Sequence, residues 1–271
     1  MVRAMANLVD PNRLKLIRAR ARPEGMFLHE IAADEVKDRL ELVNRRFTRP
    51  AVVTGFPDPW RAAFPDARIV PDDEVLALEP GAHDVVIHGL SLHWANDPVT
   101  QVFQCHQALE PDGLFVGVTF GGQTLHELRA VLAEAEVALT GGLSPRVLPM
   151  GEIRDLGHML QMAGLALPVA DSLLQKVSYP DALALMRDLR AMGEGNALAD
   201  RAGRTRRDMF RLAADTYASS FGENGRVRAT FEMVFLTGWA PHESQQKPLK
   251  PGSATARLAD ALGANQTDLP D

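Results

Sequence analysis

The stretch HDVVIHGLSLHWANDPVTQVFQCHQALEPDGLFVGVTFGG, residues 83–122, decides the fold. Its first part, residues 84–92, is a short apolar run rich in Val, Ile and Leu, which is typical of a buried strand. Residues 114–120 form a second run of the same kind, preceded by the turn residues 110–113 and followed by two glycines. The stretch therefore begins and ends with a strand.

The residues between these two strands predict a helix. Asp97 is placed to cap it and Pro98 stands at its first position, where its missing N–H costs nothing. Residues that recur at spacings near three and four predict its buried face: Val99, Val102, Phe103, His106 and Leu109. A strand, a crossover helix and a strand predict a parallel sheet covered on both faces.

The composition indicates a globular chain without a nucleic-acid surface over the whole molecule. The 271 residues can bury one large core, and 46% hydrophobic with 24% charged residues is ordinary. A net charge of −6 argues against broad nucleic-acid binding, and the single cysteine, Cys105, excludes internal disulfides. No apolar run approaches the roughly 20 residues of a membrane span, and no secretory signal stands at the start, so we expect a cytoplasmic protein.

The remaining patterns predict an organisation in three parts. We expect helices in residues 1–50, an α/β domain over 51–245 with helical insertions at 143–220, and an extended tail at 246–271. Residues 227–239 alternate apolar and polar side chains and predict a long strand, antiparallel at the end of the sheet. The basic residues near the start favour a solvated helix over an arm for an acidic partner or a membrane surface.

The segment between residues 51 and 83 is too short for a complete nucleotide-binding half-sheet. A crossover takes at least about 10–12 residues and a strand about 5, so three of each need roughly 45 to 50. One βα repeat is therefore missing after the first strand, which we place at residues 51–56. The turn after it, residues 55–60, has one glycine, two prolines and two bulky aromatic residues, and so makes a poor cofactor loop.

Several stretches carry a family resemblance that covers nearly the whole chain from about residue 10. LSLHWAND (90–97) and ALEPDGLF (108–115) resemble the strand 4 to strand 5 region of class I S-adenosylmethionine-dependent methyltransferases. Within that superfamily, five segments resemble the methyltransferase-fold assembly factors of mitochondrial complex I and their bacterial relatives. They are FGGQTLHELR (120–129), GLSP (142–145), DLGH (155–158), DLRAMGEGN (188–196) and GWAPHESQ (238–245).

The resemblance implies a Rossmann-like α/β methyltransferase fold with a seven-stranded, mostly parallel sheet and an antiparallel last strand, from which this chain departs by the missing βα repeat after strand 1. It implies S-adenosylmethionine as cofactor and a protein substrate or respiratory complex subunit as partner. The mitochondrial relatives are known for hydroxylating an arginine of a complex I subunit. The chain departs from the family's D-x-G-C-G-x-G cofactor loop, because VTGFPDP (53–59) matches it only at Gly55.

The same resemblance gives the candidate cofactor and catalytic residues. The ribose carboxylate has no counterpart, whereas Asp72 matches the adenine-side acidic turn, and Gly55 and Leu90 complete the candidate cofactor set. His93 and Trp94 follow a strand at the expected crevice, where they would contact substrate or cofactor. Their alternative role is structural, with Trp94 packed in the core and His93 capping the loop.

Candidate partner-binding residues lie in or beside the family-like stretches: Arg129, Arg146, Glu194, Asn196 and His242. An arginine among them would bind a carboxylate of a peptide, and its alternative role is a structural ion pair. No 2-His-1-carboxylate pattern is visible, since His83, His88 and His93 are five residues apart and neighbours therefore point to opposite strand faces. We predict no metal site.

Three functions remain open at this point, and we name the methyltransferase first because the implied fold and most of the superfamily favour it. The chain is a methyltransferase-like protein that uses S-adenosylmethionine on a protein or in respiratory complex assembly, a non-catalytic binding or assembly protein that has lost the cofactor site, or a protein-arginine hydroxylase. The first two differ in one feature of the structure. An open crevice beside Asp72 and His93 favours the enzyme, whereas a crevice filled by Phe56 or Trp60 favours the binding protein.

Overall fold

The computed structural model describes residues 7–245 except 202 and 204, so the predicted tail at 246–271 lies outside the described residues. The chain divides into two units, residues 1–241 and 242–271, and the following account concerns the first. No helix among the described residues is both long and apolar enough to cross a membrane.

One sheet with the strand order β2-β1-β3-β4-β7-β5 forms the centre of the first unit. Its strands are β1 (Pro50–Val53), β2 (Arg68–Val70), β3 (His83–Gly89), β4 (Leu109–Phe120), β5 (Ala166–Tyr179), β6 (Gly222–Glu223) and β7 (Arg226–Trp239). The pairs from β2 to β4 are parallel, whereas β7 runs antiparallel to β4, β5 and the short β6. The predicted mostly parallel sheet with an antiparallel last strand is thereby confirmed, but the predicted position of that strand is wrong, because β7 lies between β4 and β5 and not at the end of the sheet.

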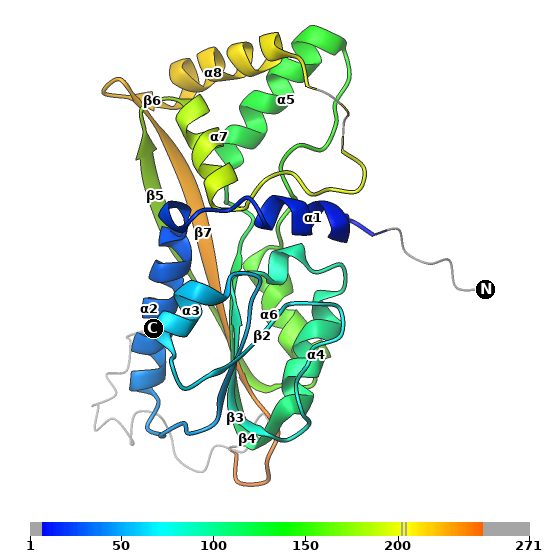
Figure 1. Ribbon diagram of the computed structural model, residues 1–271, viewed down its shortest axis with the longest axis vertical. Coiled ribbons are helices and arrows are strands. Elements are labelled where there is room, and N and C mark those ends of the chain that lie inside the picture. Colours follow the sequence, from blue (N-terminus) through cyan, green and yellow to red (C-terminus); the bar gives the residue numbers. More distant parts are fainter. Residues whose placement is uncertain (1–6, 202, 204, 246–271) are drawn as a thin grey trace, which may run out of the picture. The chain divides into compact units, whose positions relative to one another are not determined.

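Helices cover both faces of this sheet (Figure 1). They are α1 (Pro11–Arg18), α2 (Phe27–Leu42), α3 (Pro57–Ala63), α4 (Pro98–Ala108), α5 (His126–Thr140), α6 (Ile153–Met162), α7 (Ala182–Ala191) and α8 (Arg207–Phe221), with the short 3-10 turns η1 (Pro23–Gly25) and η2 (Leu92–Trp94). Side chains of β3 alternate between the layers. Val85 and Ile87 pack in the same core as α2 and α5, whereas Val86 packs with α4 and α6.

The predicted crossover helix is α4, and its start follows the sequence signal. The Asp97 side chain accepts a hydrogen bond from the Thr100 N–H at 2.9 Å, and Pro98 occupies the first turn. The predicted buried face is wrong at Phe103, which is 46% exposed. Leu109 is buried as predicted, but it begins β4 and does not belong to the helix.

The missing βα repeat is also confirmed. Between the start of β1 and the start of β3 the chain forms only α3 and β2, and residues 71–82 contain no helix or strand. Strand β2 therefore forms the edge of the sheet beside β1. The first strand ends at Val53 and not at residue 56, and β3 ends at Gly89 and not at residue 92.

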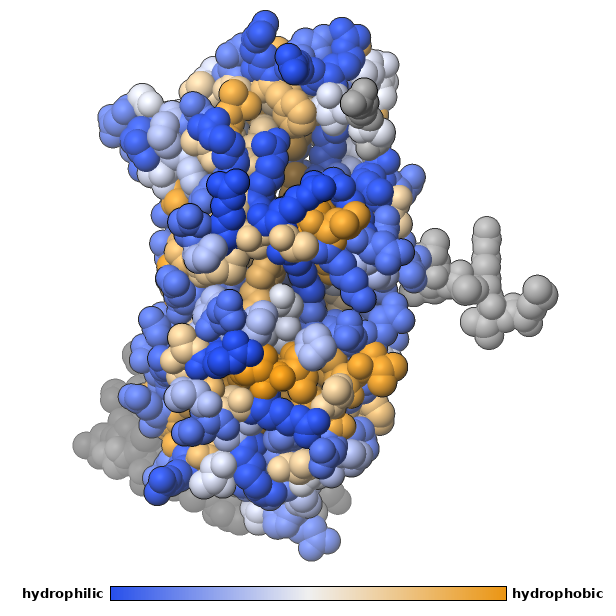
Figure 2. Space-filling view, in the orientation of Figure 1, coloured by the Kyte–Doolittle hydropathy of each residue, from blue (hydrophilic) through white to orange (hydrophobic). Residues whose placement is uncertain are grey.

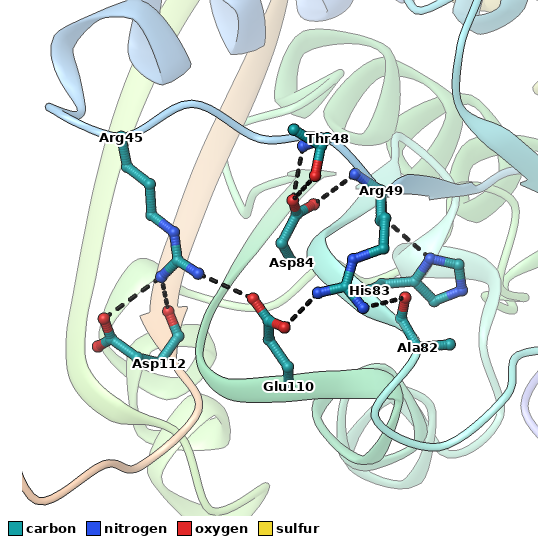
Figure 3. A network of polar contacts seen from close by, with 8 residues as sticks. All are labelled: Arg45, Thr48, Arg49, Ala82, His83, Asp84, Glu110 and Asp112. Carbon is teal, nitrogen blue, oxygen red and sulfur yellow. Dashed lines mark hydrogen bonds and ion pairs between the residues drawn. The ribbon is translucent and has the colours of Figure 1, made fainter.

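A polar network lies at the amino ends of the parallel strands β1, β3 and β4 (Figure 3). The Asp84 carboxylate accepts hydrogen bonds from the Thr48 N–H at 2.5 Å, the Thr48 hydroxyl at 3.0 Å and the Arg49 N–H at 2.9 Å. Glu110 forms ion pairs with both Arg45 and Arg49. The network therefore joins the loop before β1 to the starts of β3 and β4.

Asp84 supplies a pH-dependent part of the stability. Its burial acts to raise its pKa, but the hydrogen bonds from Thr48 and Arg49 outweigh this and hold the pKa below its ordinary value. Because the native pKa of Asp84 is lowered, its contribution to the free energy of unfolding is complete above the pKa that it has in the unfolded chain. It is lost as pH falls through the native value.

We therefore expect Asp84→Asn to lower the free energy of unfolding by about 2 kcal/mol at neutral pH, since three hydrogen bonds lose an ionised acceptor. The difference from wild type should shrink below about pH 4. Urea unfolding followed by circular dichroism measures both effects. The matched control is Asp66→Asn in an exposed turn. Equal stability of the two variants at neutral pH contradicts the role of Asp84.

Candidate functional site

The crevice expected for this fold lies where the strand order reverses. From β1 the chain proceeds to β2 on one side, and β3 pairs on the other side. Ligands of open α/β sheets bind outside the carboxyl ends of the strands at such a point. The segments that follow β1 and β3, residues 54–56 and 90–91, therefore border the position where a cofactor would lie.

Backbone donors of the loop after β1 are already used within the protein. The Gly55 N–H donates to the Ser91 hydroxyl at 3.2 Å, and the Phe56 N–H donates to the Thr54 hydroxyl at 3.2 Å. The Thr54 hydroxyl in turn donates to the Gly89 carbonyl at 3.0 Å. The next residue is Pro57, which has no N–H. This loop thus presents none of the free amide groups with which related folds hold a ligand.

An ion pair lies across the same loop. Arg18 donates to both carboxylate oxygens of Asp72 at 2.7 and 2.8 Å, and the two side chains are only 14% and 9% exposed. The guanidinium sits directly over Gly55, since a Cβ atom added there would lie 2.3 Å from the Arg18 Cζ. Asp72 was the predicted adenine-side acid, and the structure gives it an arginine partner instead.

Two aromatic side chains, one from the loop and one from α3, are buried next to the loop, although a cavity of about 450 Å³ lined by Gly55, Phe56 and Asp58 remains beside it. Trp60 is fully buried and lies so close to Gly89 that a Cβ there would come within 2.4 Å of the indole. Its N–H donates to His29 Nδ1 at 3.1 Å. Phe56 is 7% exposed and packs 4.8 Å from the His29 ring, measured between ring centroids. Both residues that we named as able to fill the crevice are therefore inside the molecule.

The third predicted cofactor residue, Leu90, belongs to the core. It is 1% exposed and its N–H donates to the Val118 carbonyl at 3.0 Å. Its backbone adopts a positive φ of 49°, which turns the chain away from β3 towards η2.

His93 and Trp94 lie on η2 and meet a carboxylate that is far away in the sequence. Glu194 accepts a hydrogen bond from the Trp94 indole N–H at 3.0 Å, and the same oxygen lies 3.2 Å from His93 Nε2. The other Glu194 oxygen has no hydrogen-bond partner in the described part of the chain. Burial acts to raise the pKa of Glu194, but His93, His29 and Arg18 hold it below its ordinary value, so the carboxylate is ionised.

Two buried histidines, His29 and His88, complete the interior of the crevice, and no pattern in the sequence pointed to His29. Burial lowers the pKa of His29 to about 4, and it has the same effect on His88. His88 Nε2 lies 3.0 Å from the Gln101 side-chain oxygen. Both imidazoles are therefore neutral at pH 7. Within residues 7–245, gaps excepted, no three His, Cys, Asp or Glu side chains converge as a metal-binding group.

The predicted partner residues differ in what they contact. Arg146 forms an ion pair with Glu136 at 2.6 Å, and this contact is the first cause that lowers the pKa of Glu136 to about 2. The Arg129 guanidinium donates to the Thr124 carbonyl at 3.3 Å. His242 lies in the second unit, where its ring is 2.7 Å from the Ser244 hydroxyl.

Four of the predicted site residues surround one cavity of about 310 Å³, namely Trp94, Arg146, Glu194 and Asn196. Its walls are mainly apolar and come from β4, α5, α7, α8 and β7, including Phe120, Leu128, Leu189, Phe210 and Phe231. Arg13 and Arg190 also line it. Such a cavity can bind an apolar group, and Glu194 in its wall has one buried carboxylate oxygen without a hydrogen-bond partner among the described residues.

No protein-family model matches the chain. Over 231 residues it is 38% identical to the mitochondrial arginine-hydroxylase NDUFAF5 of Danio rerio, and the match covers 84% of this chain and 72% of that protein. The chain spans 60%, 59% and 57% of the rat, mouse and human proteins of the same name, which is a smaller share than it spans of the Danio rerio protein.

A malonyl-[acyl-carrier protein] O-methyltransferase of Laribacter hongkongensis is 34% identical over 189 residues, which are 69% of this chain and 61% of that protein. Among solved structures, a phosphoethanolamine N-methyltransferase of Haemonchus contortus matches with a TM-score of 0.42 and 10% identity, over 77% of this chain and 53% of that chain. The resemblance seen in the sequence is confirmed by the zebrafish relative. This chain belongs to the NDUFAF5 family and has a methyltransferase-type Rossmann-like fold.

Proposed function

We propose that this chain is a binding protein in the assembly of a respiratory complex, and that its methyltransferase fold does not take up S-adenosylmethionine. One observation carries the proposal. The Arg18 guanidinium lies over Gly55 and already pairs with both oxygens of Asp72, so the glycine and the carboxylate of the expected cofactor site are engaged with the protein itself.

The energetics support a crevice that stays closed. A cofactor would have to displace the Trp60 indole, whose complete burial is worth roughly 3 kcal/mol. It would also have to separate a buried ion pair, and an uncompensated buried charge costs about 3–5 kcal/mol. The loop offers no compensation, because the N–H groups of Gly55 and Phe56 already donate within the protein.

The partner class comes from the family. The segments 120–129 and 188–196, which resemble complex I assembly factors, supply residues to the Glu194 cavity, and the cavity lies on the side of the fold away from α4 and α6. A protein that has lost its cofactor but keeps this surface retains a binding role. We therefore assign respiratory complex assembly to binding and not to group transfer.

Arginine hydroxylation, the activity in the name of the relatives, is the second candidate. The observation that favours it is the ionised Glu194 carboxylate, which keeps one oxygen free beside an apolar cavity. A carboxylate in that position is suited to a guanidinium. Mass spectrometry of complex subunits from cells with and without the chain tests this alternative through the gain of one oxygen atom.

Isothermal titration with S-adenosylmethionine and with S-adenosylhomocysteine tests the closed crevice. We expect no heat of binding up to millimolar ligand, because Arg18 covers Gly55 and pairs with Asp72, and the N–H groups of Gly55 and Phe56 already donate within the protein. The Laribacter methyltransferase serves as the positive control. Micromolar binding that disappears in Asp72→Asn, but not in the neighbouring exposed Asp73→Asn, contradicts the proposal.

Deletion of the gene tests the assembly role. We expect less assembled complex I on native gels of membranes from the deletion strain, and recovery when the wild-type chain is expressed from a plasmid. The physical reason is that an assembly intermediate loses a binding partner while its own subunits are unchanged. An unaltered amount and activity of complex I in the deletion strain contradicts this role.

A further inference from the structure

A second concave surface lies between α1 and α7 and is lined by arginines. The groove has a volume of about 530 Å³. Five guanidiniums border it, from α1, the turn after α1, and α7: Arg13, Arg20, Arg22, Arg187 and Arg190. Figure 2 shows many hydrophilic side chains on this face, where α1 lies beside the end of α7. The groove is thus strongly positive, although the whole chain carries a net charge of −6.

None of these five guanidiniums has an ion-pair or hydrogen-bond partner among the residues that the structure describes, and the Arg13 Nε is buried without one. Nearby carboxylates are engaged elsewhere. Asp10 accepts from the Arg13 N–H and pairs with Arg201, and Asp188 accepts from the Tyr179 hydroxyl at 2.7 Å. The arginines therefore repel one another without compensation from the protein, which is a cost that a bound anion would remove.

The groove adjoins the apolar cavity described above. Arg13, Arg190, Gly195 and Asn196 line both spaces. Glu194 lines the cavity, its side chain is only 8% exposed, and one of its carboxylate oxygens is buried without a hydrogen-bond partner among the described residues. A ligand that spans both spaces therefore meets three kinds of surface: guanidiniums, apolar walls, and one buried hydrogen-bond acceptor.

We propose that the groove and the cavity together bind an acidic segment of a partner protein, and this inference rests on the proposed binding function. Carboxylates of the segment pair with the arginines, and one apolar side chain that carries an N–H or O–H donor enters the cavity and donates to Glu194. A free anion would leave the cavity empty. A lipid acyl chain would place hydrocarbon against the ionised Glu194, so a peptide satisfies the site best.

The test uses the full chain and a short fluorescein-labelled peptide in which glutamates flank one leucine and one tryptophan. Fluorescence anisotropy gives its Kd. We expect saturable binding that weakens with salt, and a Kd at least about tenfold higher for the double variant Arg187→Glu/Arg190→Glu. The matched control is Arg154→Glu on α6, an exposed arginine with no side-chain partner in the described residues, which should bind like wild type.

Four results overturn the inference. They are no binding at millimolar peptide, equal binding by the groove variant and the Arg154→Glu control, and equal binding of a peptide with glutamine in place of every glutamate. The last is retention on phosphatidylglycerol vesicles that the acidic peptide does not displace, which assigns the groove to a membrane.

The failure of this inference is distinguishable from failure of the assembly role. If peptide binding fails while the wild-type chain still restores complex I in the deletion strain, only the groove assignment is wrong. If complex I is unaltered by the deletion, the assembly role is wrong whatever the peptide does.

Discussion

The buried ion pair between Arg18 and Asp72 is the interaction on which this molecule depends. It ties the end of α1 to the loop after β2, over the carboxyl ends of the parallel strands. At an effective dielectric constant near 20, two unit charges about 4 Å apart attract by about 4 kcal/mol. Desolvation offsets part of that gain, so the pair is best understood as fixing one arrangement of α1 rather than as a large net source of stability.

That arrangement links the two features of functional interest. It places the Arg18 guanidinium over Gly55 and the rest of α1 beside α7. A backbone hydrogen bond from the Arg22 N–H to the Ala191 carbonyl at 2.8 Å holds the turn after α1 there. The helix whose last residue covers Gly55 therefore also presents Arg13 to the groove. The proposed loss of the cofactor site and the proposed binding surface thus depend on the same helix.

Caps and apolar periodicity predicted the strands and the crossover helix, because these signals depend on residues close together in the sequence. The number of residues between the first two clear strands predicted the missing repeat. The burial of Phe56 and Trp60 could not be predicted from the sequence, because bulky residues in a loop can point either into the protein or towards solvent. The pairs Arg18 with Asp72 and His93 with Glu194 are 54 and 101 residues apart, and one sequence carries no information on such partners. Phe103 was misplaced because a period near 3.6 leaves the edge of a helical face ambiguous.

A double-mutant cycle on Arg18→Ala and Asp72→Ala, measured by urea unfolding, tests the central claim most directly. We predict that each single variant loses about 3 kcal/mol and that the double variant loses little more, which gives a coupling energy of about 2 kcal/mol or more. The exposed pair of Arg61 and Asp58 provides the control cycle, with a coupling below about 1 kcal/mol. Additive losses at Arg18 and Asp72 would contradict an ion pair that closes the crevice.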